Sequence, residues 1–311
     1  MMPRVVVAGS ENDTSFAVVD FTNPTLPKRT LVNPGFGAGC RVALGGHSAA
    51  VGNVLGGDVR VVNVANPASP VLQGKATTVL AGIGGLAIRK ALVVIGESAN
   101  NFKARAVAID FSRPTVPVVL GTAHTALSSN GGPAISSVAF VSDYVVMVSG
   151  ADFEIVQVDF TIPGSPVVTN FNPRLAGPPV IDVDANARII AAGDSTSGIL
   201  KWFDADSKTQ LGSINTKLTT INSVAIAVPR ILVASQNEFN ADLSDLVGPT
   251  RTAFNPRLGG GSVTAIEGTT GLCGAILGST VALVDVSGAP NLLGTADATI
   301  PSISTVAMST V

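Results

Sequence analysis

Acidic residues at the ends of apolar segments are the side chains of this sequence best placed to do chemistry. Glu97 and Asp194 each follow a glycine that ends such a segment, and Glu238 lies in the polar run SQNEFNAD at 235–242. Carboxylates and histidines can act as general acids and bases. If the protein is an enzyme, we expect these three residues and His124 to be its acid–base candidates, in a lyase, a cyclase or a hydrolase.

The same kinds of segment are candidates for binding without catalysis. Asn237 extends the last acidic segment, and the sequence FNPRL occurs at 171–175 and again at 254–258, where it contains Arg174 and Arg257. Carboxylates and amides favour hydroxyl-rich or cationic ligands, whereas two guanidinium groups can bind an anion through paired hydrogen bonds. The structural alternative is that these loops are polar because they are solvated, and that each arginine bonds neighbouring backbone.

Metal and cofactor signals are weak. The sequence contains no G-x-S-x-G, P-loop, H-E-x-x-H or G-x-G-x-x-G motif. It has two histidines, too few for a His-rich metal site. Asp182, Asp184 and Asn186 have calcium-loop spacing, but the glycine expected at the sixth position is missing, so a hairpin turn is predicted. We therefore expect no cofactor, and Ca²⁺ or Mg²⁺ held by loop carboxylates is the alternative.

Composition limits the class of partner. The chain has 19 basic and 21 acidic residues, a formal net charge of −2, so there is no electrostatic reason to expect nucleic acid as a partner. The mean hydropathy is +0.46, yet the longest apolar run, 79–88, is far shorter than the roughly 20 residues of a membrane-spanning helix. No signal peptide is recognisable, which predicts a cytoplasmic protein; a secreted or surface protein whose signal is omitted from this sequence is the alternative.

An internal repeat supplies the elements that position these residues. Each copy has an apolar triplet, an Asp or Asn anchor, and a turn that usually contains proline, as in AVVDFTNPTLP (17–27) and AVAIDFSRPTVP (106–117). The anchors are 40 to 49 residues apart: Asp20, Asn63, Asp110, Asp159, Asp204, Asp245 and Asp285. This period is typical of a four-stranded propeller blade. We therefore predict one all-β domain over 1–311, a seven-bladed β-propeller in which each anchor accepts hydrogen bonds from turn amides.

The termini predict how the ring closes. The C-terminal SISTVAMSTV resembles the innermost strand of a blade, as in SSVAFVS at 136–142, and residues 3–21 resemble the strands that follow it. We therefore predict a blade built from three N-terminal strands and one C-terminal strand, which leaves no open sheet edge. In this arrangement Cys40 and Cys273 lie on different blades, and we expect both to be unpaired core residues.

In a propeller, the loops between the second and third strands share one face with the connections between blades. We call this the top face. Its loops are predicted to bring polar residues to the mouth of the central channel, with Arg174 and Arg257 on the rim. The predicted set is Glu11, Asp13, Glu97, Asn100, Asn101, Asp194, Gln236, Asn237 and Glu238. The predicted partner is a small polar molecule, a glycan or a protein.

The repeated phrase V-[IV]-D-[VF]-[ST]-x-P-x-x-P resembles the LVIVD repeat of bacterial and archaeal propeller proteins. The resemblance covers five blades well, whereas the copies at Asp204 and Asp245 lack the double-proline turn. It implies a propeller, often on a secreted or surface-bound protein, and it implies no catalytic residues. A non-enzymatic binding propeller is our first hypothesis. A propeller enzyme using top-face carboxylates, and a self-assembling structural protein, are the alternatives.

Overall fold

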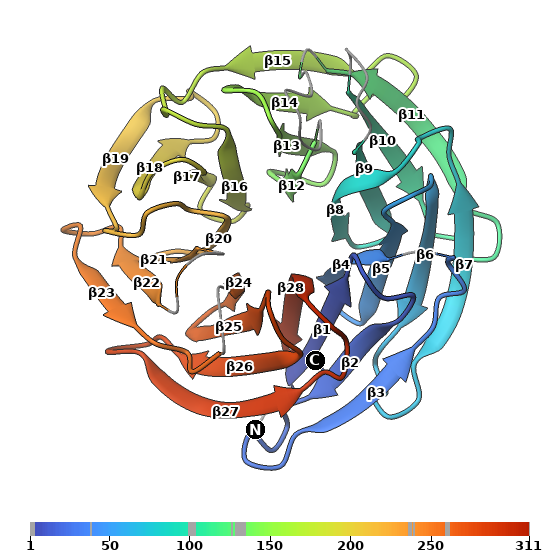
Figure 1. Ribbon diagram of the computed structural model, residues 1–311. Coiled ribbons are helices and arrows are strands. Elements are labelled where there is room, and N and C mark those ends of the chain that lie inside the picture. The colour runs from blue at the N-terminus through green and yellow to red at the C-terminus, as the bar shows by residue number, and fades with distance from the viewer. Residues whose placement is uncertain are drawn as a thin grey trace.

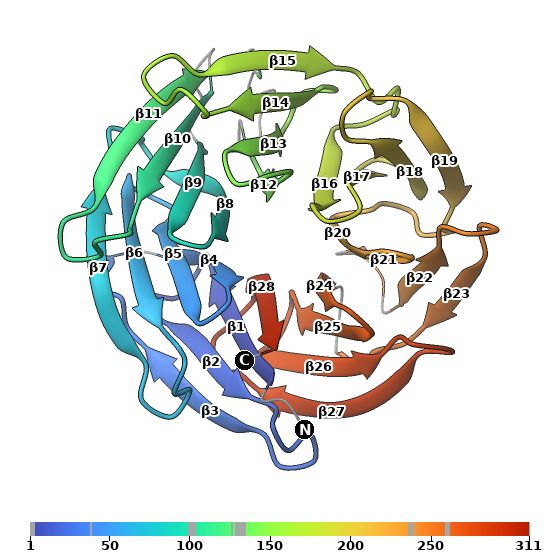
Figure 2. The same ribbon diagram turned by 180° about the vertical axis from the view of Figure 1, so that it is seen from behind.

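The computed structural model describes residues 4–37, 39–98, 104–125, 127, 135–235, 238, 240–258 and 262–310. Within these ranges, seven four-stranded antiparallel sheets are arranged in a ring (Figure 1, Figure 2). Their innermost strands line a central channel. The described residues form no helix, and so none that is long and apolar enough to cross a membrane. The predicted all-β, seven-bladed propeller is confirmed.

Four strands build each blade, in order from the channel outward. The first three blades are β28 (Ile303–Thr310), β1 (Arg4–Ser10), β2 (Phe16–Asp20) and β3 (Lys28–Val32); β4 (Cys40–Gly45), β5 (Ser48–Asn53), β6 (Asp58–Asn63) and β7 (Val71–Thr77); and β8 (Ile83–Arg89), β9 (Leu92–Glu97), β10 (Arg105–Asp110) and β11 (Val118–His124). The fourth and fifth are β12 (Ser137–Phe140), β13 (Val145–Ser149), β14 (Ile155–Asp159) and β15 (Val167–Phe171); and β16 (Pro179–Asp184), β17 (Ile189–Asp194), β18 (Ile199–Asp204) and β19 (Gln210–Asn215). The sixth and seventh are β20 (Ser223–Ala227), β21 (Arg230–Ala234), β22 (Ala241–Asp245) and β23 (Arg251–Phe254); and β24 (Ser262–Glu267), β25 (Thr270–Ala275), β26 (Thr280–Asp285) and β27 (Asn291–Asp297).

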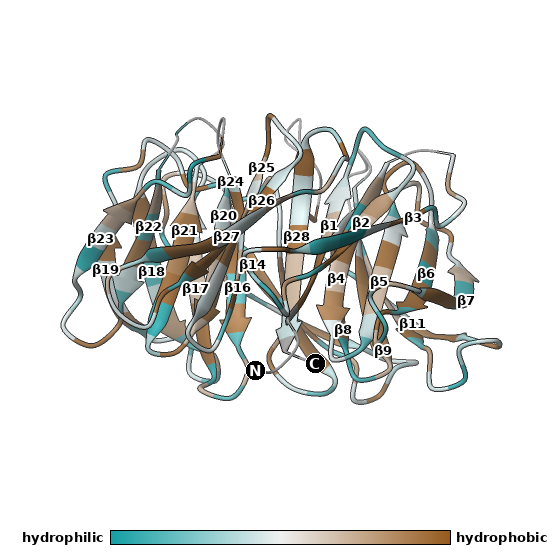
Figure 3. Cartoon of the chain, turned by 90° about the horizontal axis from the view of Figure 1, so that it is seen from below, coloured by the Kyte–Doolittle hydropathy of each residue, from teal (hydrophilic) through white to brown (hydrophobic). Residues whose placement is uncertain are grey.

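The first blade closes the ring as the sequence predicts. Strand β28 pairs antiparallel with β1 from Arg4 opposite Thr310 to Ser10 opposite Ile303. Strands β2 and β3 complete the sheet on its outer side. The start of β1 and the end of β28 lie at the same edge of the ring in Figure 3. The two ends of the chain are therefore joined within one continuous sheet, and β1 has a partner on both sides.

Apolar side chains cover both faces of the inner strands because each blade packs between two others. All six residues of β9 and all six of β25 are buried. One core cluster joins Val5 and Phe16 of the first blade to Cys40 and Val51 of the second. The hydrophobic residues of this chain thus form the contacts between blades, which explains its high mean hydropathy.

The anchor residues have the structural role predicted for them. In all seven blades a side-chain oxygen of the anchor accepts a hydrogen bond, 2.7–3.0 Å long, from the backbone N–H two residues later. Asn63 makes this bond as the aspartates do, and so do Asp204 and Asp245 in the two divergent copies. The anchor is therefore an Asx-turn residue after the third strand of each blade.

Both cysteines are buried and unpaired, as predicted. Cys40 packs between the first and second blades, and Cys273 packs between the sixth and seventh. Burial raises the pKa of each thiol to about 12. The two side chains therefore act as small apolar core residues.

Candidate functional site

The innermost strands enclose a channel that widens at the top face. Its narrow middle has a volume of about 190 Å³. At the top face it opens into a cavity of about 520 Å³, which we call the top mouth. Seven residues line both spaces: Arg41, Ser136, Ser137, Val180, Asn222, Val263 and Ser304. The two spaces are therefore continuous, and five of the seven residues where they join are polar.

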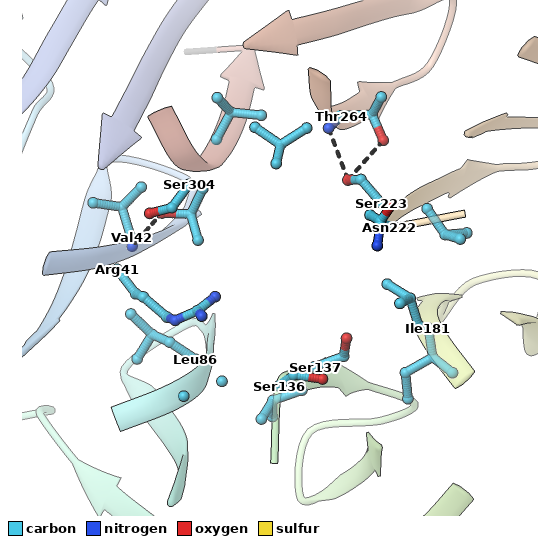
Figure 4. Close-up of a pocket in the computed structure, with 18 residues that line it drawn as sticks. Arg41, Val42, Leu86, Ser136, Ser137, Ile181, Asn222, Ser223, Thr264 and Ser304 are labelled. Atoms are coloured by element: carbon cyan, nitrogen blue, oxygen red, sulfur yellow. Dashed lines mark hydrogen bonds between the residues drawn. The ribbon is translucent and has the colours of Figure 1, made fainter. Parts of the chain in front are cut away.

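Arg41 of β4 is the only charged residue among the described residues that line the middle of the channel. Its guanidinium group points into the open channel in Figure 4, and its side chain is 16% exposed. Nη2 donates a hydrogen bond to the carboxylate of Glu11, in the loop after β1, whereas the buried Nε has no partner in the part of the chain that the structure describes. Burial lowers the pKa of Arg41 although Glu11 opposes the shift. One carboxylate therefore compensates this cation only in part.

Hydroxyl groups form most of the remaining polar lining, and some of them have structural roles. The innermost strands have no strand partner on the channel side, so their amides need other acceptors. Ser223 Oγ accepts the N–H of Thr264 at 2.8 Å, and Thr305 Oγ1 accepts the N–H of Val42 at 3.1 Å (Figure 4). These two hydroxyls join neighbouring blades. In the same view Asn222 lies across the channel from Arg41, and Ser136 and Ser137 lie on the wall between them.

Glu97 is fixed by an arginine of the next strand outward. Its side chain is 1% exposed, and Arg105 of β10 binds it through Nε–Oε2 at 2.8 Å and Nη2–Oε1 at 2.5 Å. Burial raises the pKa of Glu97, but the hydrogen bonds and charge of Arg105 outweigh this effect and hold the pKa below its ordinary value. Glu97 is therefore ionised at neutral pH, and its carboxylate lies outside the channel lining.

Asp194 joins two top-face loops. Its side chain is buried, with Oδ2 accepting the N–H of Ala176 at 2.9 Å. Oδ1 accepts both the N–H and the hydroxyl of Thr196 at 2.8 Å. Burial opposes ionisation, but these hydrogen bonds lower the pKa below its ordinary value. The carboxylate thus links the connection between the fourth and fifth blades to the loop that follows β17.

Four further predicted residues line neither space: Glu238, Arg174, Arg257 and His124. Glu238 Oε1 accepts the N–H of Thr219, in the connection between the fifth and sixth blades, at 2.5 Å. Arg174 and Arg257 are exposed on connections between blades. His124 is exposed on β11, the outermost strand of its blade. Four predicted residues lie outside the described ranges: Asn100, Asn101, Gln236 and Asn237.

The repeated sequence FNPRL forms a turn that places Arg174 and Arg257. Each arginine N–H bonds the asparagine side chain two residues earlier, and φ is 54° at Arg174 and 59° at Arg257. Lys217 and Thr299 have the same left-handed backbone without the Asn-Pro sequence, and their N–H groups bond the side chains of Asn215 and Asp297. The residue that follows each turn is buried: Leu175, Leu218, Leu258 and Ile300. The sequence signal for this turn is an Asn or Asp three positions before a single apolar residue in an otherwise polar loop.

The structure thus brings Glu11 and Arg41 together at the top mouth, and it places Glu97, Asp194 and His124 elsewhere. Direct contact between the predicted residues and a ligand stays a prediction. Among the described residues, no group of three His, Cys, Asp or Glu side chains could hold a metal ion. Asp184 Oδ1 accepts the amides of Asn186 and Ala187, so the calcium-like spacing belongs to a hairpin turn, as predicted.

The chain matches no protein-family model and no curated protein. Among solved structures it is similar to the crystal structure of the computationally designed Ika8 protein. The two are 14% identical, the match covers 97% of this chain and 89% of that chain, and the TM-score is 0.62. At this identity the likeness shows the fold alone.

Proposed function

We propose that this protein is a non-enzymatic binding propeller that takes a small polar molecule, or the hydroxyl-rich end of a glycan, into its top mouth. The observation that carries the proposal is the cavity of about 520 Å³ at that face, whose lining includes Arg41, Ser137 and Asn222. Its volume lies within the range of about 300–1,000 Å³ that is usual for ligand pockets. A closed ring holds these side chains in place before binding, which reduces the entropy that binding costs.

The opposite end of the channel gives weaker support for a site. A cavity of about 490 Å³ opens there, and three of the charged side chains that line it, Arg89, Asp182 and Asp184, have internal partners. Arg89 Nε bonds Asp143 at 3.0 Å, and Asp184 accepts the N–H of Val228 at 2.9 Å. At the top mouth the guanidinium group of Arg41 instead points into the open channel, and Glu11 is its only hydrogen-bond partner among the described residues. A cation directed into the cavity favours the top mouth.

In this proposal the sequence-predicted acids support the site indirectly. Glu97, Asp194 and Glu238 hold top-face loops through the hydrogen bonds described above. Arg174 and Arg257 remain available to a ligand large enough to reach the rim. The lowered pKa values of Glu97 and Asp194 favour binding over acid–base catalysis, because a general acid needs a pKa near the working pH. The LVIVD-like repeats fit the same class of protein without specifying a ligand.

Two tryptophan variants at opposite ends of the channel test the proposal. Asn12 lines the top mouth and Asn186 lines the opposite cavity, and both are exposed. Wild type, Asn12→Trp and Asn186→Trp are screened by thermal shift against sugars, polyols, sugar acids and short glycans. We expect compounds that stabilise wild type and Asn186→Trp but not Asn12→Trp. Equal stabilisation of all three proteins would contradict the proposal, and so would turnover of the bound compound.

Self-assembly is a second candidate because apolar side chains project from the turns between third and fourth strands. The exposed fractions are 71% for Leu26, 67% for Val116, 69% for Ile162 and 80% for Val247. Exposed apolar residues that form an interface bury their surface when copies associate. Light scattering over a hundredfold concentration range tests this candidate, with Val116→Ser and Ile162→Ser together as the comparison. A concentration-dependent mass that the double variant abolishes would favour self-assembly.

A further inference from the structure

The two charged side chains at the top mouth differ in their exposure to solvent. Arg41 and Glu11 are the only charged residues among the described residues that line this cavity. The Arg41 side chain is 16% exposed, whereas that of Glu11 is 43% exposed. Water screens an exposed carboxylate far more than a buried guanidinium group. The field inside the cavity is therefore dominated by the cation.

Arg41 also has hydrogen-bond donors to spare. A guanidinium group carries five N–H donors in a planar fork. The hydrogen bond to Glu11 comes from Nη2, and Nε, which is buried, has no partner within the described ranges. Glu11 is the only hydrogen-bond partner of the guanidinium group among the described residues, so the N–H groups that face the channel can donate to a ligand oxygen. Carboxylate oxygens suit this fork because they accept two parallel hydrogen bonds.

The rest of the wall around this space suits hydroxyl groups. Asn222 lies across the open space into which Arg41 points, and Ser136 and Ser137 lie on the wall between them (Figure 4). Their hydroxyl and amide groups can both donate and accept hydrogen bonds. The mouth has an apolar side as well, because Val263 and Leu277 also line it. The cavity thus offers one cation, several neutral hydrogen-bonding groups and a small apolar surface.

We propose that the ligand is a small hydroxylated organic acid whose carboxylate binds the guanidinium group of Arg41 and whose hydroxyl groups bond Ser136, Ser137 and Asn222. This inference rests on the proposed function and names the ligand class of the same site. Sugar acids and hydroxy acids have this chemistry. Glu11 positions Arg41 and at the same time opposes the incoming anion.

The test compares matched acids and neutral compounds by isothermal titration calorimetry at constant ionic strength. The probes are gluconate against sorbitol, and lactate against propane-1,2-diol. We expect at least one acid to bind wild type at least tenfold more tightly than its neutral counterpart. Arg41→Met should weaken the binding of that acid at least tenfold. Arg113→Met removes the same charge from an exposed turn between β10 and β11, so it should change the affinity less than twofold.

Glu11→Gln is a second variant that does not depend on Arg41→Met folding well. It removes the competing carboxylate, so the acid should bind more tightly than to wild type. Three results would overturn the inference: equal affinity for acids and neutral compounds, unchanged binding by Arg41→Met, or no binding of either acid at millimolar concentration. If neutral polyols bind at the top mouth as well as acids do, the inference fails and the proposed function stands. If every polar compound binds elsewhere, both fail.

Discussion

The carbonyl oxygen of Pro24 lies so close to Gly294 that a Cβ atom on Gly294 would be 1.9 Å from it. Gly294 belongs to the outermost strand of the seventh blade, and Pro24 belongs to the turn after β2 in the first. The outermost strand has a register shift beside Gly294. The same approach occurs at two other junctions between blades: Gly74 with Pro114, and Gly121 with Pro163. A bulge with glycine therefore lets one blade receive the turn of the next.

Gly294→Ala should destabilise the protein because its new methyl group requires the Pro24 turn to move. We expect the free energy of unfolding to fall by about 3 kcal/mol, the upper part of the range for overpacking. Gly288→Ala is the matched control, since nothing lies within 4 Å of the position its Cβ would take. Chemical denaturation of both variants measures the effect. Equal stability of the two would show that the junction tolerates a side chain.

Removal of residues 302–311 should open the ring. Without β28, strand β1 loses its inner partner along its whole length and presents an unpaired edge next to the channel. Such edges pair with other chains, so we expect a lower melting temperature and aggregation in size-exclusion chromatography. A shortened protein that stays monomeric and melts like the full chain would contradict the closed-ring account.

Asp194→Ala should lower stability although Asp194 was predicted from the sequence to be a binding residue. The substitution removes the acceptor for three hydrogen bonds and leaves two backbone amides without their partner. We expect a loss of about 3 kcal/mol in the free energy of unfolding. Asp206→Ala is the control, because Asp206 pairs with Arg188 at an exposed position, where ion pairs contribute little. Equal unfolding curves for the two variants would show that Asp194 does not hold these loops.

Protonation of Asp182 should make the protein more stable as the pH falls from neutral. Burial raises the pKa of Asp182 to about 6, and the charge of Asp184 adds to the shift, while a hydrogen bond from the Ile226 amide opposes it. The ordinary pKa is 3.8, so between about 4 and 6 the folded chain binds a proton that the unfolded chain does not. Asp182→Asn should therefore raise the melting temperature at about pH 8 and change it little near pH 4. An equal effect at both pH values would contradict this assignment.

The fold could be predicted because each of the seven copies of the repeat indicates one four-stranded blade. The anchor Asp or Asn marks the end of every third strand, even in the copies at Asp204 and Asp245 that lack the proline turn. The bulges beside Gly74 and Gly294 were not predicted. Their requirement for glycine comes from a turn in the neighbouring blade, which the local sequence does not reveal.

The candidate site was harder to predict because it depends on which way each inner strand faces. Arg41 stands in a strand that otherwise lacks charge, and only the position of β4 in the ring shows that its side chain enters the channel. Glu97 and Asp194 end their strands at the top face, as predicted. Their side-chain partners, Arg105 and Thr196, depend on local geometry that spacing alone does not supply.

A crystal structure of the protein with the compound that binds most tightly in the screen tests the central claim most directly. The account predicts difference density for that compound at the top mouth, with an oxygen about 3 Å from the guanidinium nitrogens of Arg41. Density for the compound at the opposite end of the channel or on the outer surface, with none at the top mouth, would contradict it.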